Sequence, residues 1–237
     1  MFFELLLDII KLTIIIAGLY FGISTYARSQ HPSWSEPLER RRFTILLALI
    51  LAVIAIKISE DVLYDESGVF DNAIMLFIHS YFPGSLNGIF KIITNSGSIY
   101  VLLPLTIIVV LSLLYAKRRF EATLLASSVV SSAIIVYFLK TLVDRDRPLL
   151  WKTEWYWGSS FPSGHTLVVA TFATAAALCI GRIWPKKRML ALSFAILWLG
   201  LVAFSRLVLG VHWPTDVLAA MCIGIFIPLM VNMMCRK

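Results

Sequence analysis

Long apolar runs separated by short polar segments make up most of this chain. Seven of the runs approach the roughly 20 residues that an α-helix needs to cross the hydrocarbon layer of a membrane. They cover about residues 5–24, 43–58, 99–115, 120–139, 165–181, 189–205 and 216–234. This pattern predicts an all-α fold, a polytopic transmembrane helix bundle.

The first run differs from the other six, because Glu4, Asp8 and Lys11 interrupt it. It has neither a basic start nor a small-residue cleavage site, so it is a poor signal peptide. We therefore divide the chain into residues 1–42, an N-terminal hydrophobic helix with a cytoplasmic loop, and residues 43–237, a six-helix core. The pattern leaves open whether the first run crosses the membrane or lies on its surface.

Basic residues between the runs predict the orientation, because Lys and Arg in short loops are retained on the cytoplasmic side. The basic segments are Arg28 with Arg40–Arg42, Lys117–Arg119, Arg182 with Lys186–Arg188, and Arg236 with Lys237. Since these segments alternate along the chain, we expect all of them to be cytoplasmic. The stretch from Ser59 to Ser98 is acidic apart from Lys91, and it predicts short helices lying along the outer membrane surface.

The composition agrees with a membrane protein. Hydrophobic residues make up 59% of the chain and charged residues 15%, whereas an average soluble domain has about 45–50% and about 25%. A net charge of +7 would be compatible with nucleic acid binding in a soluble protein. Here the cytoplasmic segments account for most of that charge, so we expect a membrane and no nucleic acid as partner.

Two outer segments break the charge pattern. One runs from Lys140 to His165 and the other from Arg206 to Asp216, and both place cations on the side that should lack them. Charges at helix ends near lipid are costly and usually mark a functional site. The cations in these segments are Lys140, Arg145, Arg147, Lys152 and Arg206.

These segments also carry the residue types that bind phosphate. The guanidinium groups of Arg147 and Arg206 match phosphate oxygens, and Lys140 adds a further positive charge. Ser163 and Gly164 precede a predicted helix, whose free N–H groups and dipole favour an anion. The sequence therefore predicts a phosphate site on the outer side.

Two of the four histidines, His165 and His212, lie in the same segments. His212 stands four residues before Asp216, so in a helical turn the carboxylate can reach one ring nitrogen and leave the other free. This arrangement favours His212 as a nucleophile. His165 would then protonate the leaving oxygen.

Three stretches together resemble the signature motifs of the type 2 phosphatidic acid phosphatase superfamily. They are KTLVDRDRP (Lys140–Pro148), PSGH (Pro162–His165) and SRLVLGVHWPTD (Ser205–Asp216). Every defining position is matched in order and spacing, which makes three linked motifs far more specific than PSGH alone. The resemblance extends from about residue 43 to the C-terminus.

The resemblance implies a phosphatase that forms a phosphohistidine on His212. Asp216 resembles the family residue that orients this histidine, and His165 resembles the general acid that later activates water. The residues that resemble the phosphate cradle are Lys140, Arg147, Ser163, Gly164 and Arg206. No metal or other cofactor is implied, and we expect Asp144 and Asp146 to pair with the neighbouring arginines instead of binding a metal.

Each of these residues also has an ordinary structural interpretation. Lys140 could extend from a helix end toward the membrane surface, Ser163 could cap a helix, and Asp216 could stabilise a first turn. All of these would have to coincide with three motif spacings on one membrane face, so we favour a site. For Arg145, Lys152 and the aromatic cluster we favour an interfacial belt over guidance of a lipid headgroup. This cluster is Trp151, Trp155, Tyr156, Trp157 and Trp213.

The leading hypothesis is an enzyme that hydrolyses a lipid phosphate or pyrophosphate at the outer leaflet. We expect it in a bacterial inner membrane, with its site facing the periplasmic or extracellular side. Substrates of this class include phosphatidic acid, phosphatidylglycerophosphate, undecaprenyl pyrophosphate and lipid A. The same site could serve a lipid phosphotransferase, and the cations alone would suit a non-enzymatic transporter of anionic lipids. The sequence does not distinguish among the lipids, and it does not define the oligomeric state.

Overall fold

The computed structural model describes residues 2–30, 39, 41–82, 84–148 and 158–234 of the chain. Within those ranges every regular element is helical. The elements are α1 (Phe2–Gln30), α3 (Arg42–Leu63), α4 (Gly68–Tyr81), η1 (Gly84–Leu86), α5 (Asn87–Asn95), α6 (Ile99–Tyr115), α7 (Arg119–Val143), α8 (Gly164–Ile183), η2 (Pro185–Lys187), α9 (Arg188–Val208) and α10 (Pro214–Met234). The all-α prediction is confirmed.

The described residues contain 7 helices long and apolar enough to cross a membrane, and they match the seven predicted runs. Most are longer than the apolar run itself. Helix α3, for example, continues past the predicted end at residue 58 to Leu63. There Lys57 Nζ lies 2.7 Å from Asp61 Oδ1, one helical turn away. Such pairing lets charged residues extend a helix beyond its apolar stretch.

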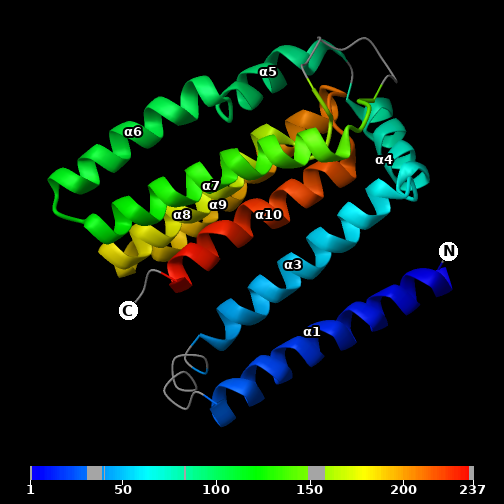
Figure 1. Ribbon diagram of the computed structural model, residues 1–237. Helices are drawn as coiled ribbons and strands as arrows, with labels where there is room; N and C mark the ends of the chain where they lie inside the picture. Colours follow the sequence, from blue (N-terminus) through cyan, green and yellow to red (C-terminus); the bar gives the residue numbers. More distant parts are fainter. Residues whose placement is uncertain (1, 31–38, 40, 83, 149–157, 235–237) are drawn as a thin grey trace.

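Helix α1 lies beside α3 and apart from the other long helices (Figure 1). No residue in its apolar stretch, Leu7–Tyr26, is buried inside the protein. Its separate position fits the division into residues 1–42 and 43–237, although that division and a membrane crossing by α1 stay predictions.

Helix α8 is the centre of the bundle and packs against α7, α9 and α10. Its small side chains allow this close packing, as is common between membrane helices. The contact with α10 is close: a Cβ atom on Gly224 would lie 2.5 Å from Ala170 Cβ and 2.6 Å from the Leu167 carbonyl oxygen. Glycine at position 224 is therefore required, and this contact brings the starts of α8 and α10 together.

The acidic segment between α3 and α6 forms the short helices α4 and α5, as predicted. Helix α4 lies at an angle to the long helices at one end of the bundle (Figure 1). Two contacts hold α5 on α9: Trp198 Nε1 donates to Ser96 Oγ at 2.9 Å, and Arg206 Nη1 donates to Thr94 Oγ1 at 2.8 Å. The segment therefore covers the bundle end where the predicted motifs lie.

Candidate active site

The ends of four long helices meet beside α4, and each carries a residue that the motifs single out. Lys140 is in the last turn of α7, His165 in the first turn of α8, Arg206 in the last turn of α9 and Asp216 in the first turn of α10. Lys140, Arg147 and Arg206 are close enough to interact electrostatically with both His165 and His212. The structure thus brings together two imidazoles and three cations that are spread over more than 70 residues of sequence.

The buried imidazole of His212 lies between a carboxylate and a guanidinium group. Its Nδ1 atom is 3.4 Å from Asp216 Oδ2, four residues further along the chain. On the opposite side, Nε2 is 3.4 Å from Arg147 Nη1. The Nδ1 separation is longer than an ordinary hydrogen bond, so the carboxylate acts on the ring mainly through its charge. The carboxylate therefore lies beside one ring nitrogen, and the other nitrogen faces the guanidinium group of Arg147. The catalytic role of His212 stays a prediction.

The surroundings of His212 favour its neutral form. Burial, followed by the charges of Arg206, Arg147 and Lys140, holds the pKa of His212 well below its ordinary value of 6.5. A charged imidazole would lose its hydration in this site and face several cations at once. At neutral pH the ring therefore keeps a nitrogen lone pair, which a nucleophile requires.

Backbone carbonyl groups orient two of the cations. Lys140 Nζ donates a hydrogen bond to the carbonyl oxygen of Ser159. Arg147 Nη1 donates to the carbonyl oxygen of Val211 at 2.8 Å, and its Nε donates to that of Gly158 at 3.3 Å. Since a carbonyl oxygen carries no net charge, these contacts fix the direction of the side chains without cancelling their positive charge. That is the property required of a phosphate cradle.

The start of α8 supplies further donors. Ser163 is its N-cap residue, but its Oγ atom bonds to Thr166 Oγ1 at 2.9 Å and does not cap a backbone N–H. The N–H groups of the first turn have no partner within the helix, and they favour an anion at this end. A Cβ atom on Gly164 would lie 3.6 Å from Val136 Cγ1 and 4.0 Å from Lys140 Cε, which are ordinary contacts. Any steric need for glycine here would therefore come from the bound anion.

Arg145 has a central place in the structure that sequence analysis missed. Its Nη1 donates to Asp216 Oδ1 and its Nη2 to Asp71 Oδ2, both at 2.6 Å. Both carboxylates are completely buried, and the Arg145 side chain is only 14% exposed. The favoured interpretation of Arg145 as part of an interfacial belt was wrong. It was also wrong to expect Arg145 to pair with its neighbours Asp144 and Asp146.

Asp71 completes this network from helix α4. It accepts hydrogen bonds from the Thr215 backbone N–H at 3.0 Å and from Thr215 Oγ1 at 2.7 Å. The chain of contacts Asp71–Arg145–Asp216 therefore links α4 to the residue beside His212. In the sequence, Asp71 is one of five acidic residues in the segment from Ser59 to Ser98. Nothing in the sequence distinguished it from the other four as the partner of Arg145.

Trp213 belonged to the predicted aromatic belt, and it contacts the same network. The guanidinium carbon of Arg145 lies 5.6 Å from the centre of the Trp213 ring. The Trp213 backbone N–H donates to Asp216 Oδ2 at 2.9 Å, and its Nε1 donates to the carbonyl oxygen of Asp146 at 2.9 Å. Trp213 therefore helps to hold the Asp216 carboxylate and the Arg145 guanidinium group in place. The rest of the aromatic cluster and Lys152, together with Arg40, Arg236 and Lys237, lies outside the described residues.

The described residues contain no group of three or more His, Cys, Asp or Glu side chains that could hold a metal ion. Independence from a metal stays a prediction, tested below.

Comparisons with known proteins agree with the motifs. The family described as the PAP2 superfamily matches residues 121–236, a range that contains all three motifs. Phosphatidylglycerophosphatase B from Escherichia coli K12 is 37% identical over 83 residues, which are 34% of this chain and 32% of that relative. This chain thus matches about a third of that relative's length.

A longer match is to an undecaprenyl-diphosphatase from Sulfolobus acidocaldarius. It is 30% identical over 149 residues, which cover 60% of this chain and 68% of that relative. Among solved structures, a transmembrane PAP2-type phosphatidylglycerolphosphate phosphatase from Bacillus subtilis superimposes with a TM-score of 0.72 at 24% identity. That superposition covers 78% of this chain and 94% of the other, so the two chains share one fold.

Proposed function

Because this chain belongs to the PAP2 superfamily, we propose that it is an integral membrane enzyme that removes phosphate from a lipid phosphate or lipid pyrophosphate. The observation that carries the proposal is the meeting of His165 and His212 with three cations at the joined helix ends. The relatives named above act on phosphatidylglycerophosphate or undecaprenyl diphosphate, as their names state. We propose a substrate of that class here.

In the proposed reaction, Lys140, Arg147, Arg206 and the N–H groups at the start of α8 hold the transferring phosphoryl group. Nε2 of His212 attacks phosphorus, and the bond to the leaving oxygen breaks. His165 donates a proton to that oxygen, so the alcohol or phosphate leaves in a stable form. The imidazole of His165 then takes a proton from water, which attacks the phosphohistidine and releases inorganic phosphate. Fixed cations and N–H groups stabilise the charge that develops on the phosphoryl oxygens.

Arg145 and Asp71 position this machinery and do not touch the substrate. Arg145 holds Asp216 at 2.6 Å, and Asp71 holds Arg145 from the other side. Asp216 in turn lies beside Nδ1 of His212 and favours the tautomer with the proton on that nitrogen. The lone pair on Nε2 then faces the phosphate.

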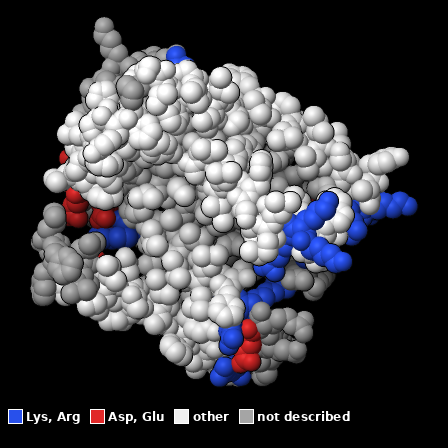
Figure 2. Space-filling view, turned by 180° about the vertical axis from the view of Figure 1, so that it is seen from behind, with Lys and Arg blue, Asp and Glu red and all other residues white. Residues whose placement is uncertain are grey.

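We also propose that the site faces the periplasm of a bacterial inner membrane. Most of the Lys and Arg side chains seen in Figure 2 lie toward the right and the bottom of the view, where one acidic group lies among them, and a second group of acidic side chains lies at the left beside a basic one. The basic end includes Arg41 and Arg42 at the start of α3 and the Lys186–Arg188 segment between α8 and α9. The positive-inside rule assigns such an end to the cytoplasm, and this supports a position of His165 and His212 on the outer side.

A panel of lipid phosphates tests the reaction. With phosphatidic acid, phosphatidylglycerophosphate and undecaprenyl pyrophosphate, the purified protein should release inorganic phosphate from at least one, and a chelator should leave the rate unchanged. Loss of activity on chelation would show that a metal takes part. Phosphate that appears on an added lipid or sugar and not in solution would identify a phosphotransferase.

Vanadate separates an enzyme from a transporter. Because vanadate mimics the transition state of phosphoryl transfer, it should inhibit phosphate release strongly. Anionic lipid movement across vesicles that is insensitive to vanadate, with no phosphate released, would indicate a transporter instead.

The pH dependence of kcat/KM should be bell-shaped, because His212 must be neutral and His165 protonated. The lowered pKa of His212 means that its neutral form persists below pH 6.5, so the acid limb should lie below that pH. On the acid side, activity is lost as the pH falls through the lowered pKa of His212, and on the alkaline side it is lost as His165 gives up its proton. The rates should be measured with a substrate whose own ionisation has been determined separately. A flat profile between about pH 4 and 9 would contradict both assigned roles.

A further inference from the structure

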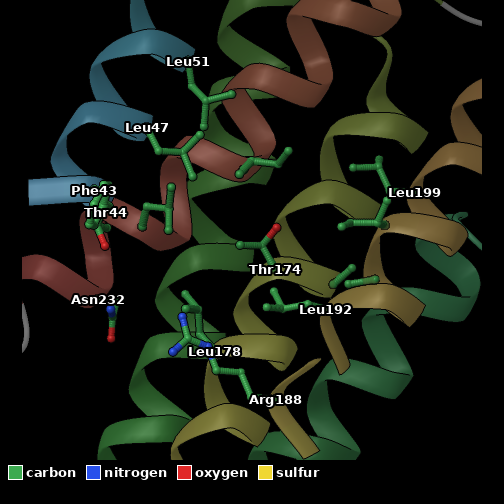
Figure 3. Close-up of a pocket in the computed structure, with 15 residues that line it drawn as sticks. Phe43, Thr44, Leu47, Leu51, Thr174, Leu178, Arg188, Leu192, Leu199 and Asn232 are labelled. Carbon is green, nitrogen blue, oxygen red and sulfur yellow. The ribbon is translucent and has the colours of Figure 1, made fainter. Parts of the chain in front are cut away.

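A cavity lies far from the histidines, between α3, α8, α9 and α10 (Figure 3). Its volume is about 450 Å³, which is within the range of about 300–1,000 Å³ typical of ligand pockets. The thirteen residues from His165 to Leu178, a residue of the cavity wall, correspond to about 20 Å along α8. The cavity is therefore near the opposite membrane face from the candidate active site.

Most of the cavity wall is aliphatic, and its polar groups are few. Figure 3 shows Leu51 and Leu199 toward the top of the view and Arg188 and Asn232 toward the bottom. The described lining residues are Phe43, Thr44, Leu47, Leu51, Ala173, Thr174, Leu178, Arg188, Leu192, Ala195, Ile196, Leu199, Ile225, Leu229 and Asn232. Such a cavity suits a molecule with an apolar chain and one polar end, which is the chemistry of a lipid.

The direction of the Arg188 side chain is fixed by packing against α8. A Cβ atom on Gly181 would lie 3.1 Å from Arg188 Cγ and 3.5 Å from its Cδ, so the stem of Arg188 lies directly on this glycine. The described cavity wall includes no Asp or Glu. By contrast, the nearby Arg182 lies 3.4 Å from Glu121 Oε1 and stacks on the Phe120 ring. Arg188 therefore presents its charge to the cavity, while Arg182 is engaged by the protein.

Asn232 supplies a second polar group at this end. Its Oδ1 atom is buried and has no hydrogen-bond partner within the described part of the chain. Buried polar atoms nearly always have a partner. A ligand with a hydroxyl group would provide the missing donor, and its phosphate could accept from the Arg188 guanidinium.

The charge of the surrounding surface favours an anion. Arg41 and Arg42 lie at the start of α3, where Arg41 Nη1 donates to the carbonyl oxygen of Met233 at 3.2 Å, next to Asn232. Lys186 and Lys187 belong to η2, which directly precedes Arg188. Basic pockets between membrane helices on the cytoplasmic side bind anionic lipid headgroups. We propose that this cavity is a binding site for an anionic glycerophospholipid, with its phosphate on Arg188, a headgroup hydroxyl at Asn232 and an acyl chain between α3, α8, α9 and α10.

Such a lipid would act as a structural ligand and not as the substrate. It would bridge α3 to the α8–α10 bundle at the face opposite the histidines. A ligand that binds only the folded protein raises its stability in proportion to the logarithm of ligand concentration. The site does not depend on the proposed reaction.

Lipid binding to the full chain tests the proposal. The protein is purified in detergent, stripped of lipid and kept in saturating inorganic phosphate, which occupies the anion cradle of the active site. Phosphatidylglycerol and phosphatidylcholine with the same acyl chains are then compared by native mass spectrometry and by the shift in melting temperature. Phosphatidylglycerol should bind more tightly, and Arg188→Ala should weaken its binding about tenfold or more, as for the loss of a charge-assisted hydrogen bond.

Two matched controls make the result specific. Lys186→Ala removes a charge from the same end but not from the cavity, and it should leave phosphatidylglycerol binding intact. Thr174→Trp fills the cavity and should abolish binding of both lipids, whereas Leu197→Trp on the exposed face of α9 should not. Equal effects of Arg188→Ala and Lys186→Ala would overturn the site, as would full binding by Thr174→Trp. If Thr174→Trp does not fold, the comparison of Arg188→Ala with Lys186→Ala decides.

Phosphate release by Arg188→Ala in detergent should remain at the level of the unchanged protein. The proposed lipid site and the proposed reaction can therefore be tested separately, and either proposal can be rejected while the other stands.

Discussion

Replacement of His212 by Ala is expected to lower the turnover number for phosphate release by about three to six orders of magnitude. Rates fall by this much when a catalytic nucleophile that acts together with other catalytic residues is removed from an enzyme. His212 is 2% exposed, and its ring lies between Asp216 and Arg147, so its loss removes the only imidazole that the carboxylate of Asp216 orients in the described part of the chain. The measurement is release of inorganic phosphate from a lipid phosphate by the purified variant. Labelled substrate should also leave no acid-labile phosphate on this variant.

His79→Ala is the matched control. His79 is an exposed residue of α4, outside the cluster of cations, so its loss should leave phosphate release unchanged. Melting curves of both variants show whether each has kept its fold. Phosphate release by a folded His212→Ala protein at the original rate would reject the phosphohistidine mechanism.

Replacement of Arg145 by Ala is expected to give the largest loss of stability at the end of the bundle that carries the candidate active site. Removing one partner from a buried ion pair costs about 3–5 kcal/mol, because the remaining charge is left buried and uncompensated. Here two completely buried carboxylates, Asp71 and Asp216, would both lose their cation. The measurement is unfolding in detergent by heat or denaturant. A loss below about 1 kcal/mol would show that the network carries little of the stability.

The effect of Arg145 on catalysis separates positioning from substrate binding. Since Arg145 contacts Asp216 and not the phosphate cradle, its loss should lower kcat and leave KM nearly unchanged. Arg145→Lys should restore only part of the rate. One ammonium group cannot reproduce the geometry of Nη1 and Nη2, which bind Asp216 and Asp71 at the same time. A large rise in KM with kcat unchanged would place Arg145 in the substrate site instead.

A double variant tests whether Arg145 and Asp71 act together. Asp71→Asn removes one of the two carboxylates that Arg145 neutralises. In the Arg145→Ala background it should therefore cost less stability than it does alone, since residues in one charge network are not additive. Lys117→Ala changes an exposed residue in the loop before α7. Its effect on the free energy of unfolding should be additive with that of either variant.

Local spacing in the sequence was sufficient to predict the residues of the three motifs. Lys140 and Arg147 are seven residues apart, and His212 and Asp216 four apart. Distances of this kind are set by a helical turn or a short loop, so the approximate arrangement follows from the spacing itself. The alternation of basic and acidic segments likewise predicted which helix ends would meet, because successive spans must run in opposite directions.

Contacts between distant segments could not be predicted in this way. Asp71 and Arg145 are separated by 74 residues, and their pairing depends on how α4 lies on the end of the bundle. Nothing in the local pattern distinguishes Asp71 from the other acids of its segment. The same limit applies to the cavity at Arg188, whose wall comes from four helices.

The sequence by itself determined the membrane class, the helices and the chemical identity of the candidate site, because hydrophobic length, charge alternation and motif spacing are local properties of the chain. The tertiary structure alone decided which carboxylates neutralise Arg145, which nitrogen of His212 faces the cations, and where Arg188 meets an apolar cavity. These depend on packing. Helices approach closely only where small residues such as Gly224 allow it, and that approach sets which buried charges come within a few ångströms of each other.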